Sequence, residues 1–113
     1  MTVLSQSNSE RIQALNDSFR RTFTGGTVVL TQGVDALAPT MKAKVLQCVR
    51  HFDRFDSYND PHREHDFGSF EIEGERFFFK VDYYDLDMQA GSEDPADAAK
   101  TTRVLTVMKA EEY

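Results

Sequence analysis

The apolar positions in the first half of the chain recur every three or four residues, which predicts amphipathic helices. The first apolar stripe consists of Ile12, Leu15, Phe19 and Phe23. Ser7 and Glu10 precede it with the spacing of a capping box, in which each side chain accepts a hydrogen bond from a free backbone N–H group. Gly25-Gly26 follows the stripe, so a helix is expected near residues 7–23.

A second apolar stripe follows Pro39, a residue that is tolerated in the first turn of a helix. It consists of Met41, Val45, Leu46, Val49 and Phe52, and it predicts a helix near residues 39–55. Cys48 borders this stripe, and we interpret its thiol as a small buried group because free cysteine is usually buried. Between the two helices, residues 27–31 are rich in β-branched side chains and predict a short strand.

The second half of the chain predicts strands. Residues 67–72 and 75–84 are joined by Glu73-Gly74, a pair that suits a two-residue hairpin turn. The register that this turn fixes opposes Phe70 to Phe77, Glu71 to Arg76 as an ion pair, Phe67 to Lys80, and His65 to Asp82. Residues 103–108 are apolar at both alternations, which predicts a central strand covered on both faces.

Together these elements predict a single α+β domain over residues 1–113, with residues 1–6 frayed. The two N-terminal helices are expected to pack on a mostly antiparallel sheet of about four strands. The predicted core consists of Leu15, Phe19, Val29, Val45, Val49, Phe52, Phe70, Ile72, Phe77, Phe79 and Val81.

The uneven distribution of charge narrows the classes of partner. The formal net charge is −6, but residues 1–52 hold six Lys and Arg against three acids, whereas residues 53–113 hold seven against sixteen. Phosphates would be repelled by such a surface, so direct binding of nucleic acid is not expected. The sequence has no long apolar run, no secretory signal and one cysteine, so we expect a cytoplasmic protein with no membrane partner.

The densest chemical cluster spans residues 59–68, where two histidines and three acids precede a predicted strand. One interpretation is acid–base catalysis in which His65 is the base and Asp82, opposite it in the hairpin, orients the imidazole. Lys80 and Tyr84 lie on the same side of the sheet and complete this set. Because no nucleophile elbow, phosphate-binding loop or cofactor motif accompanies it, we favour a structural hydrogen bond between His65 and Asp82.

The same cluster allows a metal site. His62 and His65 are three residues apart with Asp66 beside them, and imidazole and carboxylate groups are ligands for zinc, iron or manganese. These side chains share a metal only if the backbone turns there, and Pro61 favours a conformation that points them to solvent. No cofactor is therefore expected, and ligation by His62, His65 and Asp66 is kept as the alternative.

A second candidate is the stretch from residue 81 to residue 99, which carries no Lys or Arg. Its acids are Asp82, Asp85, Asp87, Glu93, Asp94 and Asp97. Most acidic loops are simply solvated, although a long loop is often functional. Spread over one face, these carboxylates would imitate the spaced phosphates of a nucleic acid and fit a basic channel on another protein.

Several motifs resemble a bacterial family known as domain of unknown function 3768. They are Asn-Asp-Pro at 59–61, Glu-His-Asp-Phe-Gly at 64–68, Lys-Val-Asp-Tyr-Tyr-Asp at 80–85, Asp-Pro-Ala-Asp at 94–97 and the apolar segment 103–108. The resemblance extends from about residue 16 to the C-terminus. It implies relatives largely in alphaproteobacteria and their plasmids or integrated elements, and it implies no activity.

The expected function is that of a small acidic protein-binding module. Its concrete form is a mobile-element counter-defence inhibitor, a nucleic-acid mimic of the antirestriction or anti-CRISPR type. The expected partner is a host protein with a basic surface, such as a nucleic-acid-processing complex. The alternative is a small cytosolic enzyme or metal-binding protein that uses His65 and Asp82.

Overall fold

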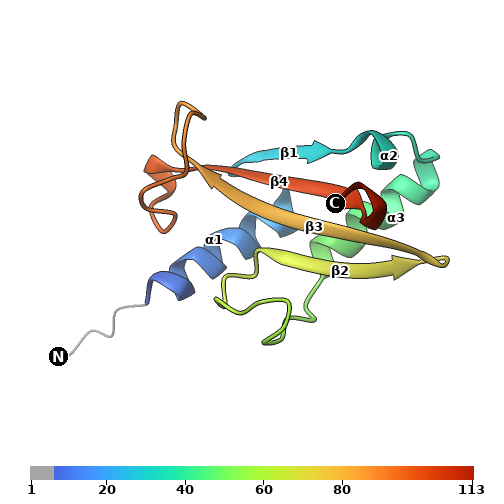
Figure 1. Ribbon diagram of the computed structural model, residues 1–113, viewed down its shortest axis with the longest axis horizontal. Helices are drawn as coiled ribbons and strands as arrows, with labels where there is room; N and C mark the ends of the chain where they lie inside the picture. Colours follow the sequence, from blue (N-terminus) through green and yellow to red (C-terminus); the bar gives the residue numbers. More distant parts are fainter. Residues whose placement is uncertain (1–6) are drawn as a thin grey trace.

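The computed structural model describes residues 7–113 and forms one mixed four-stranded sheet with helices on one face. The predicted frayed residues 1–6 lie outside the described part. In chain order the elements are α1 (Asn8–Thr22), β1 (Thr27–Leu30), α2 (Gln32–Asp35), α3 (Pro39–His51), β2 (Phe67–Ile72), β3 (Glu75–Tyr84), η1 (Ala98–Lys100), β4 (Thr102–Lys109) and η2 (Ala110–Glu112). Figure 1 shows α1 and α3 behind the sheet and the C-terminal turn in front of it.

Helix α1 begins and ends close to the predicted residues. The hydroxyl oxygen of Ser7 accepts a hydrogen bond from the backbone N–H of Glu10 at 3.2 Å and donates to the Glu10 carboxylate at 3.1 Å. At the other end Phe23 takes a left-handed conformation (φ 58°), and its N–H donates to the carbonyl of Phe19. The helix therefore ends before Gly25-Gly26, the pair that was predicted to stop it.

Helix α3 ends at His51 rather than near residue 55, because a side chain from α1 binds its last carbonyl groups. The last carbonyls of a helix have no partner within the helix. Nη1 of Arg20 donates to the carbonyl oxygens of Val49 at 3.0 Å, Arg50 at 3.2 Å and Phe52 at 2.8 Å. Phe52 is extended (φ −61°, ψ 130°), and the chain leaves the helix there.

The predicted hairpin register is confirmed. Phe70 pairs with Phe77, Glu71 with Arg76 and Phe67 with Lys80. Both turn residues have positive φ, 51° at Glu73 and 82° at Gly74, as a two-residue hairpin turn of the mirror-image class requires. The predicted ion pair between Glu71 and Arg76 does not form, because the Arg76 guanidinium donates to the hydroxyl of Ser69 at 2.7 Å instead.

The sheet is mixed, so the prediction of a mostly antiparallel sheet is wrong. The strand order is β1-β4-β3-β2, in which β3 pairs antiparallel with β2 and β4, whereas β1 pairs parallel with β4. Strand β4 is central, as predicted from its continuous apolar run. The direction of β1 could not be read from its residues, because the alternation of side chains is the same in parallel and antiparallel strands.

The core lies between the helices and the sheet, and most of the predicted core residues belong to it. Its buried members are Phe19, Val34, Val45, Val49, Phe52, Phe77, Phe79, Val81, Leu105 and Val107. Phe70 and Ile72 are half-buried at its edge, and Leu15 is also half-buried. Val29 was predicted wrongly: it pairs with Thr106 on the helix-free face and is 41% exposed. Val34 was missed because α2 is too short to show a helical period.

Gly68 permits the closest aromatic packing in this core. A Cβ atom at this position would lie 2.2 Å from the ring of Phe79 and 2.8 Å from the ring of Phe52. Those two rings meet edge to face, with centroids 5.3 Å apart. Within the part of the chain that the structure describes, no helix is long and apolar enough to cross a membrane.

Replacement of Phe79 by Ala is expected to lower the free energy of unfolding by about 3–5 kcal/mol, because it removes a ring that is 0% exposed and leaves a cavity between the sheet and α3. Chemical denaturation of both proteins measures this loss. Phe78→Ala is the control, since Phe78 is the next residue on β3 and lies half-buried on the opposite face. An equal loss in both variants would contradict the assignment of the core to the helix side.

Replacement of Arg20 by Ala is expected to cost about 3–5 kcal/mol of folding stability, since the change leaves carbonyl groups without their donor and removes one of the two partners of the Asp17 carboxylate. Arg21→Ala is a matched control because Arg21 is exposed on the same helix. Thermal and denaturant unfolding of the two variants tests the difference. A similar stability for both would show that Arg20 is not the cap of α3.

Candidate functional site

Residues 59–68, the densest chemical cluster in the sequence, form a tight turn organised by Asp60. The Asp60 side chain is buried, and its Oδ1 accepts hydrogen bonds from the backbone N–H groups of Glu64 at 2.9 Å and His65 at 3.0 Å. Arg63 and His65 both have positive φ, 58° and 55°, a conformation that is uncommon for residues with a side chain. Two carboxylate hydrogen bonds thus hold a backbone shape that these residues would not adopt on their own.

This turn directs His65 to α1 and not to the sheet. Its Nδ1 lies 2.9 Å from Oδ1 of Asp17, and its Nε2 lies 3.7 Å from Oδ2 of Asp60. The imidazole stacks on the ring of Phe55, with centroids 3.8 Å apart and planes at 5°. The predicted hydrogen bond between His65 and Asp82 is therefore wrong. The pairing of β2 with β3 extends back to Asp66, whose carbonyl accepts a hydrogen bond from the N–H of Val81. At His65, the residue before Asp66, the chain turns away from β3.

The predicted catalytic set does not converge. Lys80, Asp82 and Tyr84 alternate along β3 with the buried Phe79 and Val81, so they share the helix-free face of the sheet. Lys80 and Asp82 form an ion pair of 3.1 Å, and hydrogen bonding to Asp82 raises the pKa of Lys80. His65 lies at the side of the sheet that faces α1, so the proposed base is separated from its proposed partners.

The predicted metal ligands are likewise not gathered. Within residues 7–113, no group of three or more His, Cys, Asp and Glu side chains lies together in a way that could hold a metal ion. His62 is exposed, while the nitrogens of His65 face Asp17 and Asp60. Burial raises the pKa of Asp66, and the nearby carboxylates of Glu64 and Asp60 raise it further.

A second buried network joins α1 to the two central strands. The Asn16 side chain is 0% exposed, and its amide nitrogen donates to the hydroxyl oxygen of Tyr83 at 2.8 Å and to the carbonyl of Glu64 at 3.0 Å. The Tyr83 hydroxyl donates to the Glu64 carboxylate at 2.8 Å. Nε of Arg103 donates to the Asn16 oxygen at 2.9 Å, and another guanidinium nitrogen donates to the carbonyl of Pro95.

The pKa values in this network follow from burial. Burial raises the pKa of Tyr83, so its hydroxyl remains protonated and serves as a donor to Glu64. Burial also lowers the pKa of Arg103, against the opposing effects of Tyr83 and the Glu64 carboxylate. The guanidinium lies over the Tyr83 ring, 5.3 Å from its centroid. We interpret the network as structural, because its polar groups bind one another and not an open cavity.

The acidic stretch forms an ordered loop in which several acids hold the backbone. Oδ1 of Asp85 accepts from the N–H of Gln89 at 3.0 Å. Asp94 accepts from Ala96 at 3.2 Å, and Asp97 accepts from Ala99 at 2.9 Å at the start of η1. These three carboxylates and the ion-paired Asp82 are thus occupied, at least in part, by contacts within the chain.

Asp87 and Glu93 are different, because both are exposed and neither makes a side-chain hydrogen bond or ion pair within residues 7–113. Beside Asp87 stand two exposed apolar side chains that the sequence reasoning passed over, Leu86 at 63% and Met88 at 48% exposure. The sequence could have predicted their exposure, since apolar residues in a polar turn have no strand or helix to bury them. The loop projects beyond the ends of β3 and β4 in Figure 1.

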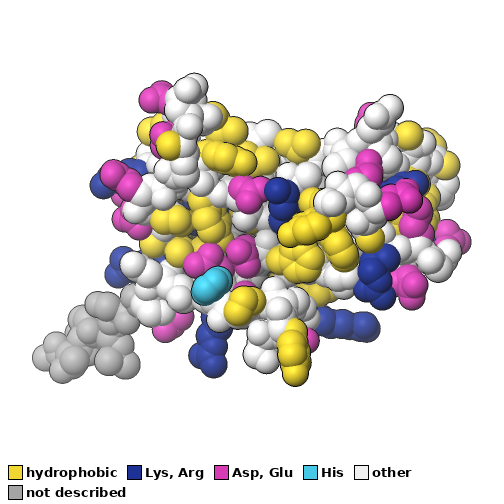
Figure 2. All heavy atoms as spheres, in the orientation of Figure 1, with side chains coloured by type: hydrophobic (Ala, Val, Ile, Leu, Met, Phe, Trp, Pro, Cys, Tyr) yellow, Lys and Arg dark blue, Asp and Glu magenta, His cyan; other side chains and the backbone are white. Residues whose placement is uncertain are grey.

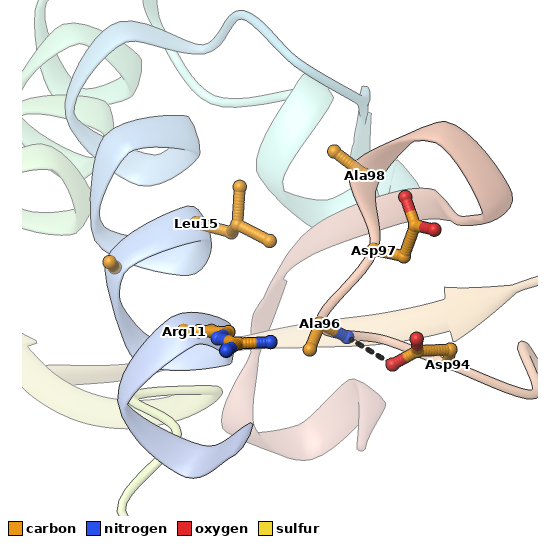
Figure 3. A pocket seen from close by; sticks show the side chains of 7 residues that line it. Arg11, Leu15, Asp94, Ala96, Asp97 and Ala98 are labelled. Carbon is orange, nitrogen blue, oxygen red and sulfur yellow. Dashed lines mark hydrogen bonds between the residues drawn. The ribbon is translucent and has the colours of Figure 1, made fainter. Parts of the chain in front are cut away.

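A shallow hollow of about 440 Å³ separates this loop from α1. Figure 3 shows Arg11 extending from α1 towards Ala96 and Asp94, with Leu15 directed towards Ala98. The Arg11 guanidinium forms no ion pair within residues 7–113, although Asp94 and Asp97 line the other side of the hollow. A basic side chain therefore borders the acidic surface, which is smaller than the sequence predicted.

The helix-free face as a whole is not a continuous acidic surface. In Figure 2 acidic side chains are scattered over the ends and the middle of this face, with Lys and Arg and apolar patches among them. One apolar cluster consists of Phe67, Phe78 and Tyr113, whose rings meet at centroid distances of 5.3 to 6.2 Å.

Comparison with known proteins identifies a family. The family model described as Protein of unknown function (DUF3768) matches residues 30–112, which is most of the chain. The chain belongs to this family. No curated protein and no solved structure matches it.

The match to DUF3768 starts later than the resemblance suggested, at residue 30 instead of about residue 16. It includes the turn around Asp60 and the acidic loop, but not α1. Helix α1 nevertheless supplies Asn16, Asp17 and Arg20 to the contacts described above. The family motifs therefore depend, in this protein, on side chains from outside the matched region.

Replacement of Asp66 by Asn is expected to stabilise the protein at neutral pH. The pKa of Asp66 is raised in the folded state above its ordinary value of 3.8, so ionisation of this carboxyl group opposes folding. This loss of stability is absent at a pH below the pKa of Asp66 in the unfolded chain, and it is complete at a pH above the raised pKa of Asp66 in the folded protein. The stability gain of Asp66→Asn should therefore shrink as the pH falls through this window.

Urea denaturation at a series of pH values measures this effect. Asp87→Asn is the control, since Asp87 is exposed and its side chain makes no hydrogen bond or ion pair within the described chain. A stability gain for Asp66→Asn that is the same at every pH would show that the carboxylate charge is not its source.

Proposed function

We propose that this protein is a small acidic protein-binding module and that the projecting loop 85–97 is its binding surface. The observation that carries the proposal is the exposure of Leu86 and Met88 beside Asp87 and Glu93, acids that are bound by no other group of residues 7–113. Exposed apolar side chains ringed by polar groups are typical of protein-interaction sites. With no Lys or Arg between residues 81 and 99, the loop complements a basic partner.

The loop is also shaped for recognition before it meets a partner. Its turn is closed by hydrogen bonds from the N–H of Asp85 to the carbonyl of Ala90 and from the N–H of Ser92 to the carbonyl of Tyr83. Arg103 fixes its far side through the carbonyl of Pro95. An ordered loop loses little conformational entropy on binding, which favours affinity.

The concrete form of the proposal is a counter-defence inhibitor that occupies the nucleic-acid channel of a host protein in the cytoplasm. The carboxylates of Asp87 and Glu93, with the outward oxygens of the other loop acids, would take the place of phosphates. Sequences that resemble this one are expected on mobile elements, where inhibitors of restriction or CRISPR systems are useful. The enzyme alternative is not proposed, since His65 does not meet Lys80, Asp82 and Tyr84.

Affinity capture from a host lysate tests the proposal. The immobilised protein is expected to retain a basic, nucleic-acid-binding partner at low salt and to release it at high salt, because salt screens exposed charges. Duplex DNA added as a competitor should displace the partner if the loop occupies a nucleic-acid channel. The double variant Asp87→Asn/Glu93→Gln should retain less partner than the unmodified protein.

The matched control is Asp53→Asn/Glu111→Gln, which removes the same charge from two exposed acids outside the loop. Equal capture by both double variants would show that net charge, and not the loop, is responsible. Recovery of no basic partner at either salt concentration would count against the proposal as a whole.

A further inference from the structure

Strand β2 is an edge of the sheet, and we propose that it pairs antiparallel with β2 of a second copy of this chain. The product is a dimer with one continuous sheet across a two-fold axis near Ser69. This inference is independent of the proposed binding loop, which lies at the end of the sheet away from the β2–β3 turn.

The hairpin register determines which backbone groups of β2 face outward. In an antiparallel pair, hydrogen-bonded and non-hydrogen-bonded residue pairs alternate. Ile72 and Glu75 flank the two-residue turn and form a hydrogen-bonded pair, and so does Asp66 with Val81 at 2.8 Å. The intervening Phe67, Ser69 and Glu71 therefore direct their N–H and C=O groups away from β3.

These outward groups have no partner in the molecule. Among residues 7–113, no hydrogen bond outside the sheet ladder uses the backbone N–H or C=O of Phe67, Ser69 or Glu71, and the register of β2 turns these groups away from β3. Edge strands are commonly protected by a proline, a lysine or a bulge, and β2 (Phe67–Ile72) contains none of them. The edge is thus open for another strand.

A second β2 satisfies this edge most fully in one register. With Ser69 opposite the partner's Ser69, Phe67 lies opposite the partner's Glu71, and every outward residue faces another outward residue. Each such pair exchanges two hydrogen bonds, which gives about six across the axis. A register shifted by one residue would set outward groups against residues whose backbone is already bonded to β3. The spacing of outward residues is therefore compatible with self-pairing.

The side chains of β2 fit the same register. On the helix side Phe70 would lie opposite the partner's Gly68, where the rings of the partner's Phe52 and Phe79 cover the backbone, so Phe70 would meet aromatic side chains there. Beside the strand lies a hollow of about 580 Å³ whose lining includes Cys48, Phe52 and Phe70. Phe70 is only half-buried by its contact with Phe77 and would bury more of its surface there.

The charges are also self-complementary. Glu71 is exposed and has no ion pair within residues 7–113, while the Arg76 guanidinium lies at the Ser69 hydroxyl. In the dimer the partner's Glu71 is diagonal to Ser69, within reach of a long side chain at that position. The two-fold axis repeats this contact, so two Arg76–Glu71 ion pairs would form across the edge and replace the pair that is absent within the hairpin.

Sedimentation velocity over a range of protein concentrations tests the dimer. The unmodified chain is expected to show a species of twice the mass of one chain that grows with concentration. Ser69→Pro should abolish it, because the N–H that proline lacks points outward and the pairing of β2 with β3 is retained. Ser69→Ala keeps the N–H and should retain the dimer. Circular dichroism confirms that each variant is folded.

A cross-link provides a second test that does not require proline to be tolerated. In a Cys48→Ser background, Ser69→Cys sets two thiols across the axis, where hydrogen-bonded Cα atoms are roughly 5.5 Å apart, within the roughly 4.4–6.8 Å of a disulfide. Mild oxidation should link this variant into a dimer and leave the exposed Ser57→Cys control unlinked. A monomer at every concentration, or equal cross-linking at both positions, would overturn the proposal.

Discussion

The guanidinium of Arg20 joins three parts of the fold: the end of α3, helix α1, and the aromatic side chains of Phe55 and Phe79. It is 1% exposed, and it binds the end of α3, the Asp17 carboxylate on its own helix and, through its positive charge, the rings of Phe55 and Phe79. Burial lowers the pKa of Arg20, which reflects the cost of removing the charge from water. The carbonyl groups and the carboxylate offset that cost, and together they fix where α3 ends and where residues 52–66 begin.

The chemistry of the 59–68 turn follows from this anchor. Asp17, which binds Arg20, also binds His65. The Phe55 ring stacks on the His65 imidazole and also contacts the Arg20 guanidinium. The histidine is thereby held against α1 by the Asp17 carboxylate at Nδ1, while Asp60 lies 3.7 Å from Nε2. A turn rich in His, Asp and Glu is thus used here to fasten a long connection to a helix, through the hydrogen bonds of Asp60 within the turn and of His65 with Asp17.

The second buried arginine has the corresponding role at the other end of the sheet. Arg103 joins β4 to α1 through Asn16 and to the acidic loop through Pro95. The loop can therefore project exposed Leu86 and Met88 without being disordered. The buried charges thus maintain the fold, while Leu86 and Met88 stay exposed in a turn and β2 forms an edge of the sheet.

The family, the two long helices, the strands and the hairpin register could be predicted from the sequence. Local periodicity and turn chemistry determine those features, as Ser7 at the start of α1 and Glu73-Gly74 in the hairpin illustrate. The core residues on β3 followed from the register, because alternate side chains share a face.

Contacts between distant residues decided the rest. The partner of His65 depends on two positive φ values and on Asp17, which lies 48 positions away. The end of α3 depends on Arg20, and the parallel direction of β1 depends on where the chain returns to β4. Only the tertiary structure separated the acids that accept backbone N–H groups in turns from Asp87 and Glu93, which face water. The sequence could not make this distinction, because it gives the number of carboxylates and not their hydrogen-bond partners.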